Sequence, residues 1–159
     1  MNVIEKIKNQ HRYLFKGDEK RFEKYIYNNL SDICNNLGYA DIKKVEMQHV
    51  IKTANYKIIP DIMIWHKDGT GTIFEVKVTN SNNPQTSPNE QIKSIGQLLL
   101  YRSVVKEKYG EFPRVFLITD QLFEKTFHVF ADNDLPVGLI EIQNDRVFVA
   151  KKIIRRCCQ

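Results

Sequence analysis

Residues 60–77 of the chain read PDIMIWHKDGTGTIFEVK, and this stretch decides the fold. It contains two apolar runs of strand length, separated by Asp68-Gly69, a dipeptide that favours the tight turn of a β-hairpin. We expect strands over 57–65 and 72–78, with a further strand over 44–51 just before them. The hairpin would bring Asp61, from its first strand, close to Glu75 in its second.

The alternation of side chains along this hairpin predicts a polar site on one of its faces. Because successive residues of a strand point to opposite faces, Glu75 and Lys77 share one face and Val76 packs on the other. Asp61 lies in an isoleucine-rich run, where a carboxylate is costly to bury unless it is paired or binds a cation. Two carboxylates side by side repel each other, which favours a divalent cation between them. Alternatively, Glu75 and Lys77 form an exposed ion pair that contributes little energy.

Helical patterns flank the hairpin on both sides. Apolar residues recur at helical spacing over 18–37, with Asp18 as the N-cap and Gly38 as the stop. The remaining expected elements are a short helix over 3–14, a polar loop over 79–90, a helix over 90–108, a strand over 114–118, a helix over 122–130 and a closing hairpin of 137–142 with 146–151. This order predicts a mixed α/β domain with a central sheet flanked by helices.

The bulk composition fits one globular domain. The chain has 159 residues, of which 42% are hydrophobic, and a formal net charge of +5, which is compatible with a polyanionic partner. Its three cysteines give neither a disulfide framework nor zinc spacing, and Cys34 lies in an apolar helical pattern typical of a core residue. With no signal peptide and no apolar run of membrane-spanning length in the sequence, we expect a cytoplasmic protein. His66, at the hairpin turn, is expected to be solvated.

The motifs as a group resemble a known family. Pro60-Asp61, followed after thirteen residues by Glu75-Val76-Lys77, resembles the motif of the PD-(D/E)XK nuclease superfamily, which includes many restriction enzymes, archaeal Holliday junction resolvases and RecB-type nucleases. Gln97 and Tyr101 match a Q-x-x-x-Y element that several branches carry on the helix after the lysine strand, and their spacing puts both on one helix face.

The resemblance covers about residues 17–119 and implies a restriction-endonuclease-like fold with an αβββαβ core. We expect a single domain over 1–159, in which residues 120–159 add a helix and a hairpin to that core. The resemblance also implies a phosphodiesterase that uses Mg²⁺, with Mn²⁺ as a substitute.

The resemblance assigns roles to individual residues. Asp61 and Glu75 would bind Mg²⁺, and Lys77 would stabilise the phosphate and orient the attacking water, while Gln97 and Tyr101 extend the site onto a helix. Family members also place a glutamate on the first helix, pointing at the metal, and the candidates here are Glu19 and Glu23. At about 100° per residue, Glu19 lies nearer the centre of the apolar stripe, so it is the predicted third metal ligand and Glu23 the alternate.

These observations predict a DNA nuclease, and two alternatives stay open. One is an RNA-directed nuclease on the same fold, and the other is a nuclease-like module that binds nucleic acid without cutting it. Degenerate binders commonly lose one residue of the triad, whereas Asp61, Glu75 and Lys77 are all present. We expect the loop over 81–89 to border the substrate groove. A homodimer also stays open, with the segment 147–154 as its only suggested interface.

Overall fold

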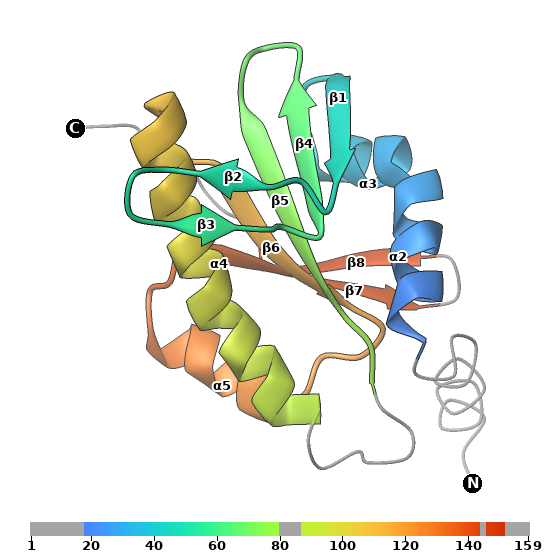
Figure 1. The fold of residues 1–159 in the computed structure, drawn as a ribbon. Helices are drawn as coiled ribbons and strands as arrows, with labels where there is room; N and C mark the ends of the chain where they lie inside the picture. Colours follow the sequence, from blue (N-terminus) through green and yellow to red (C-terminus); the bar gives the residue numbers. More distant parts are fainter. Residues whose placement is uncertain (1–17, 80–86, 144–145, 152–159) are drawn as a thin grey trace, which may run out of the picture.

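A six-stranded mixed sheet forms the centre of the molecule (Figure 1). The computed structural model describes residues 18–79, 87–143 and 146–151. Along the sheet the strands follow the order β1 (Ile42–Met47), β4 (Ile62–His66), β5 (Gly71–Lys77), β6 (Arg114–Thr119), β7 (Val137–Gln143) and β8 (Arg146–Lys151). The β1–β4, β4–β5 and β7–β8 pairs are antiparallel, whereas β5–β6 and β6–β7 are parallel. The predicted hairpin of β4 and β5 is confirmed.

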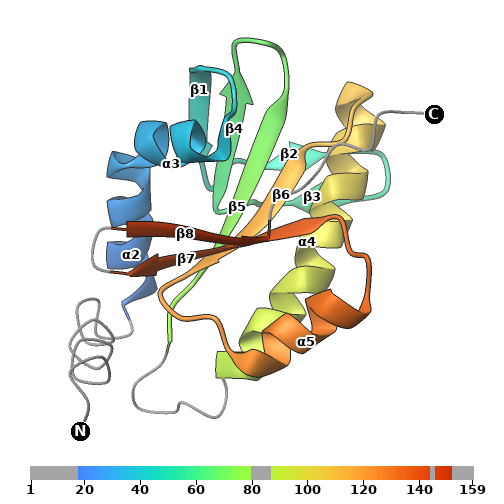
Figure 2. The same cartoon turned by 180° about the vertical axis from the view of Figure 1, so that it is seen from behind.

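Helices cover both faces of this sheet. Seen from behind in Figure 2, α2 (Glu19–Asn28) and α3 (Leu30–Leu37) lie on one side, and α4 (Ser87–Tyr109) and α5 (Glu124–Asp132) on the other. Each pair of helices packs on its own cluster of buried apolar side chains, because the strand residues alternate between the two faces. The mixed α/β architecture predicted from the sequence is therefore confirmed.

Strand β5 shows how this alternation positions the candidate site. Phe74 and Val76 belong to the apolar cluster beneath α2 and α3, while Ile73 belongs to the cluster beneath α4. By the same alternation, Glu75 and Lys77 point to the α4 side of the sheet. The sheet thus supplies both polar side chains from its most buried strand, in which Gly71 through Val76 are all buried.

Two strands were predicted too long. The strand expected over 44–51 ends at Met47, and the strand expected over 57–65 is broken at Pro60, which has no N–H to continue a ladder. The residues between these two strands form instead a separate small hairpin, β2 (Ile51–Lys52) with β3 (Lys57–Ile58). In Figure 1 this hairpin crosses in front of the main sheet and reaches α4, and β2 contacts α4.

The helix expected over 18–37 is divided at Asn29. The Asn29 side chain donates a hydrogen bond to the Tyr25 carbonyl (2.8 Å), and the Asn29 N–H bonds to Ile26 instead. Such a local side-chain bond competes with the helical ladder. The predicted ends are confirmed: Asp18 accepts from Arg21 N at 3.1 Å, and Gly38 ends α3 with φ of 74°.

His66 is a further correction, because it is buried rather than solvated. Its two ring nitrogens lie 2.7 Å from the Ala40 carbonyl and 2.8 Å from Thr72 Oγ1, so a neutral ring is fully bonded. Burial also lowers the pKa of His66, which keeps the ring neutral.

The remaining boundaries differ by a few residues. Helix α4 begins at Ser87 rather than at Glu90, and Cys34 is buried as predicted. The helix expected over 3–14 and most of the loop expected to border a groove lie outside the described residues. Within the described ranges no helix is both long and apolar enough to cross a membrane.

Candidate active site

The β4–β5 register places Asp61 opposite Glu75. Ile62 pairs with Phe74 in the antiparallel ladder, so the next position outward sets Asp61 against Glu75 on the same face. Asp61 is fixed there by the backbone of β5, since its Oδ2 accepts a hydrogen bond from Val76 N at 2.9 Å. The two carboxylates that the sequence placed together are therefore neighbours in the fold.

Glu75 is a buried acid with an unsatisfied oxygen. Its side chain is only 3% exposed, and its Oε2 finds no hydrogen-bond partner among the described residues. Burial is the main reason that the pKa of Glu75 rises to about 8, and the charge of Asp61 raises it further, while Lys77 opposes the shift. At neutral pH the site holds this carboxyl mostly protonated unless a cation replaces the proton.

Gln48 is a site residue that the sequence analysis missed. Its backbone N–H donates to the Asp61 carbonyl at 3.0 Å, and its Nε2 donates to Asp61 Oδ1 at 2.9 Å. Gln48 has φ of 50°, a conformation that is costly for a residue with a Cβ. These contacts come from the end of β1, which was predicted to continue through this position, so its side chain was counted as part of a strand.

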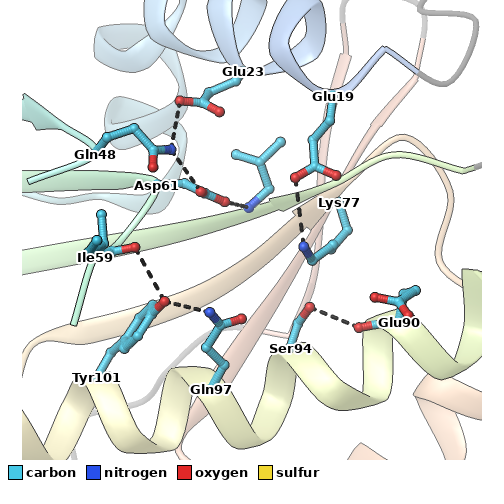
Figure 3. Close-up of polar contacts among 11 residues, drawn as sticks. Glu19, Glu23, Gln48, Ile59, Asp61, Lys77, Glu90, Ser94, Gln97 and Tyr101 are labelled. Atoms are coloured by element: carbon cyan, nitrogen blue, oxygen red, sulfur yellow. Dashed lines mark hydrogen bonds and ion pairs between the residues drawn. The ribbon is translucent and has the colours of Figure 1, made fainter. Parts of the chain in front are cut away.

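The two first-helix glutamates occupy different places at the site. Glu19 Oε1 lies 3.7 Å from Lys77 Nζ, whereas Glu23 Oε1 lies 3.4 Å from Gln48 Nε2, which links it to Asp61 (Figure 3). Burial raises the pKa of both glutamates. Among the described residues, no three histidine, cysteine or acidic side chains form a group arranged to hold a metal ion. Glu19 pairs here with the lysine, and its role as a third metal ligand stays a prediction.

Helix α4 contributes the opposite wall. Gln97 Nε2 donates to the Tyr101 hydroxyl at 2.6 Å, and that hydroxyl donates to the Ile59 carbonyl at 3.3 Å. Burial raises the pKa of Tyr101 to about 12, and the charge of Glu75 adds to the shift. In Figure 3 the Gln97 and Tyr101 side chains extend from α4 toward the side chains of Asp61 and Lys77.

Ser94, one turn before Gln97, bonds within its own helix. Its hydroxyl bonds to the Glu90 carbonyl of its own helix at 2.9 Å, and the side chain is buried.

A second buried acid, Asp120, was also missed. It follows β6, and its Oδ1 accepts from both Thr79 N and Thr79 Oγ1 at 2.9 Å, which ties the end of β5 to the end of β6. Its Oδ2 has no partner among the described residues. Asp120 thereby fixes the chain two residues beyond Lys77. A polar residue just after an apolar strand was the available signal.

The donor set fits a hard divalent cation. Mg²⁺ needs only one or two protein carboxylates, because it keeps several waters and takes further oxygens from a phosphate. Asp61 and Glu75 supply two adjacent carboxylates, and the unpartnered Glu75 oxygen is the atom that a cation would satisfy.

Comparison with solved structures found several neighbours of this chain, and two of them are nearly equal in similarity. No protein-family model and no curated protein matches the sequence. The crystal structure of a repair endonuclease from Pyrococcus abyssi is similar with 18% identity and a TM-score of 0.46, over 76% of this chain and 46% of that one. A structure of an EndoMS complex with double-stranded DNA is similar with 16% identity and a TM-score of 0.48, over 79% of this chain and 45% of that one. The chain thus spans less than half of each neighbour.

Proposed function

We propose that the protein is a metal-dependent nuclease that hydrolyses phosphodiester bonds of DNA. The observation that carries the proposal is the half-buried Asp61 set against the buried Glu75, with one Glu75 oxygen unpartnered among the described residues and Lys77 two residues further along the same strand. A protein gains no stability from a buried acid placed beside a second carboxylate, so a role in holding a cation is a physical reason to retain the pair.

Each side chain of the site has a defined task in this proposal. Asp61 and Glu75 hold Mg²⁺, which when bound polarises the scissile phosphate and lowers the pKa of a water. Gln48 holds Asp61 in place through Oδ1, leaving the carboxylate correctly aimed. Lys77 provides positive charge where negative charge develops on the phosphate, and a preorganised charge of this kind is a large contribution to catalysis.

Glu19 and the α4 side chains complete the surroundings. Glu19 orients the Lys77 ammonium group through the contact at 3.7 Å. Gln97 and Tyr101 form a bonded pair whose hydroxyl is fixed by the Ile59 carbonyl. Gln97 is exposed, and among the described residues its amide oxygen has no partner, so that oxygen can meet substrate or a water molecule at the rim of the site.

The test is a cleavage assay with several substrates. Purified protein is incubated with supercoiled plasmid, linear duplex, single-stranded DNA and RNA, in Mg²⁺, in Mn²⁺ and in chelator. We expect metal-dependent cutting of DNA that is lost in Asp61→Asn and Glu75→Gln. The control is Glu107→Gln, which removes one exposed carboxylate from the far end of α4 and should cut like the wild type.

Four outcomes would contradict the proposal. Cleavage that persists in chelator excludes the metal, and cleavage that persists in Glu75→Gln excludes this site. Cutting of RNA alone would move the protein to the RNA-directed alternative. Binding of DNA without any cutting would make the chain a binding module.

A further inference from the structure

The β2–β3 hairpin is joined to the candidate site at both of its ends. Gln48, three residues before β2, bonds to Asp61 through its backbone and its side chain. Ile59, directly after β3, accepts the hydrogen bond of Tyr101. Between these anchors Ile51 and Ile58 are buried in the apolar cluster beneath α4, so the hairpin has a fixed inner face and a fixed position.

The outer face of the hairpin carries two lysines placed directly opposite each other. Lys52 and Lys57 are cross-strand partners, and both side chains are exposed. Neither lysine forms an ion pair or a hydrogen bond with a residue in the described ranges. Like charges at opposing positions destabilise a strand pair, so the folded chain gains nothing from this arrangement by itself.

Two apolar side chains extend this outer face toward the site. Extending the register by one position sets Val50 against Ile59, and each is 40% exposed. Tyr56, in the turn next to Lys57, is 51% exposed. An exposed patch that combines unpaired cations with aliphatic and aromatic side chains suits a nucleic-acid strand, which presents phosphates together with sugars and bases.

We propose that the outer face of the β2–β3 hairpin binds the DNA strand beside the cut, with Lys52 and Lys57 holding one phosphate or two adjacent ones. This inference rests on the proposed nuclease function and names the surface that carries the substrate. A bound phosphate reduces the repulsion between the two lysines. Binding therefore offsets the destabilisation that the opposed charges cause in the free hairpin. The net charge of +5 has the sign that this partner requires.

The geometry limits where on the strand this contact falls. Lys57 and Asp61 are four residues apart, so their backbones are separated by at most about 14 Å. At 3.4 Å of rise per nucleotide that backbone distance equals about four nucleotides, and the side chains add to it, so the contact lies within several nucleotides of the scissile phosphate. The hairpin therefore contacts the DNA backbone close to the cut and not a distant part of the DNA.

The experiment measures DNA affinity against salt in chelator, where no cutting is expected. A fluorescently labelled 30-base-pair duplex is titrated with the full chain over 50–250 mM salt. The salt slope is the slope of the logarithm of the binding constant against the logarithm of the salt concentration. In the double variant Lys52→Gln with Lys57→Gln its magnitude should fall by about 1.8, and the variant should bind roughly 10- to 60-fold more weakly at 0.1 M salt. The matched control, Lys43→Gln with Lys67→Gln, removes two exposed lysines at the opposite end of the β1–β4 pair and should keep the wild-type slope.

A single charge reversal separates a binding role from a folding role. Lys52→Glu creates an opposite-charge cross-strand pair with Lys57, which should leave the thermal midpoint unchanged or raised while weakening DNA binding. A variant that simply failed to fold would lower both quantities. The proposal is overturned if the double variant keeps the wild-type slope, if the control loses as much slope, or if the wild type does not bind DNA.

The same preparations are assayed for cutting in Mg²⁺, which keeps the two proposals apart. If the wild type cuts DNA and the double variant keeps the wild-type salt slope, the hairpin proposal is wrong and the proposed nuclease function stands. Binding without cutting, with a reduced slope in the double variant, removes the nuclease and leaves the hairpin surface.

Discussion

Replacing Glu75 by glutamine should stabilise the metal-free protein while it abolishes cutting. The wild-type carboxyl has a pKa of about 8 in the folded state, against an ordinary value of 4.5 in an unfolded chain. Folding at neutral pH therefore requires either a proton taken up by Glu75 or a buried charge beside Asp61. Glutamine has nearly the same shape and no charge, and its amide can donate to Asp61.

The size of the effect follows from these two pKa values. Between pH 4.5 and pH 8 the folded state binds a proton that the unfolded state has lost, so wild-type stability falls as pH rises. Each pH unit costs about 1.4 kcal/mol, which amounts to about 3 kcal/mol at pH 7. For a chain of this length that corresponds to a rise of roughly 6–12 °C in the Tm of the variant.

The assay is urea unfolding followed by circular dichroism in chelator, at pH 4, 5.5, 7 and 8.5. We expect Glu75→Gln to match the wild type at pH 4, to exceed it increasingly up to pH 8 and to hold a constant advantage above that. Glu107→Gln, the exposed control, should stay within about 0.5 kcal/mol of the wild type. A Glu75→Gln protein that is less stable than the wild type at pH 7, or an advantage that does not change with pH, would refute this account of Glu75.

Three further substitutions test other parts of the site. Lys77→Met should lower kcat by roughly 10²- to 10³-fold with less than about a tenfold change in DNA affinity, and an equal loss in both would assign Lys77 to binding alone. Gln48→Met removes the hydrogen bond that the Gln48 side-chain amide donates to Asp61, so the Mg²⁺ concentration for half-maximal cutting should rise about 10- to 100-fold. An unchanged Mg²⁺ requirement would contradict the proposal that Gln48 positions Asp61. Asp120→Ala leaves two Thr79 donors unpaired and should cost about 1–3 kcal/mol in urea unfolding, whereas Asp120→Asn, which keeps an acceptor, should cost less. Equal losses in the two Asp120 variants would show that the Thr79 bonds contribute little.

The parts of the fold that depend on short-range chemistry could be predicted from the sequence. Asp68-Gly69 set the β4–β5 turn, where Gly69 has φ of 85°, and that turn brought Asp61 and Glu75 together. Alternation along β5 then placed Glu75 and Lys77 on one face. These inferences needed only the period of a strand and the chemistry of a turn.

The parts that failed depend on contacts between distant segments or on weak local signals. The helical spacing of apolar residues continues unchanged past Asn29, so the sequence pattern gives no sign of the break between α2 and α3. Pro60 was a signal against one long strand, and it was outweighed by the isoleucines around it. Gln48 could not be assigned to the site, because its positive φ and its bonds to Asp61 arise only once the chain returns as β4. The choice between Glu19 and Glu23 is left open by the structure too, since both border the site.

The place where the β2–β3 hairpin enters the chain has a consequence for how such a protein can diverge. Met47 and Ile62, which flank the segment 48–61, are paired neighbours in the main sheet, so the ladder of β1 and β4 closes without any help from the hairpin. Insertions or sequence changes between these two residues can therefore be tolerated by the sheet, whereas the loss of Ile51 or Ile58 would expose part of the core. The same segment ends at Asp61. Replacing the segment 48–61 during evolution would therefore change both the surface that meets a substrate and the surroundings of a candidate metal ligand in one step.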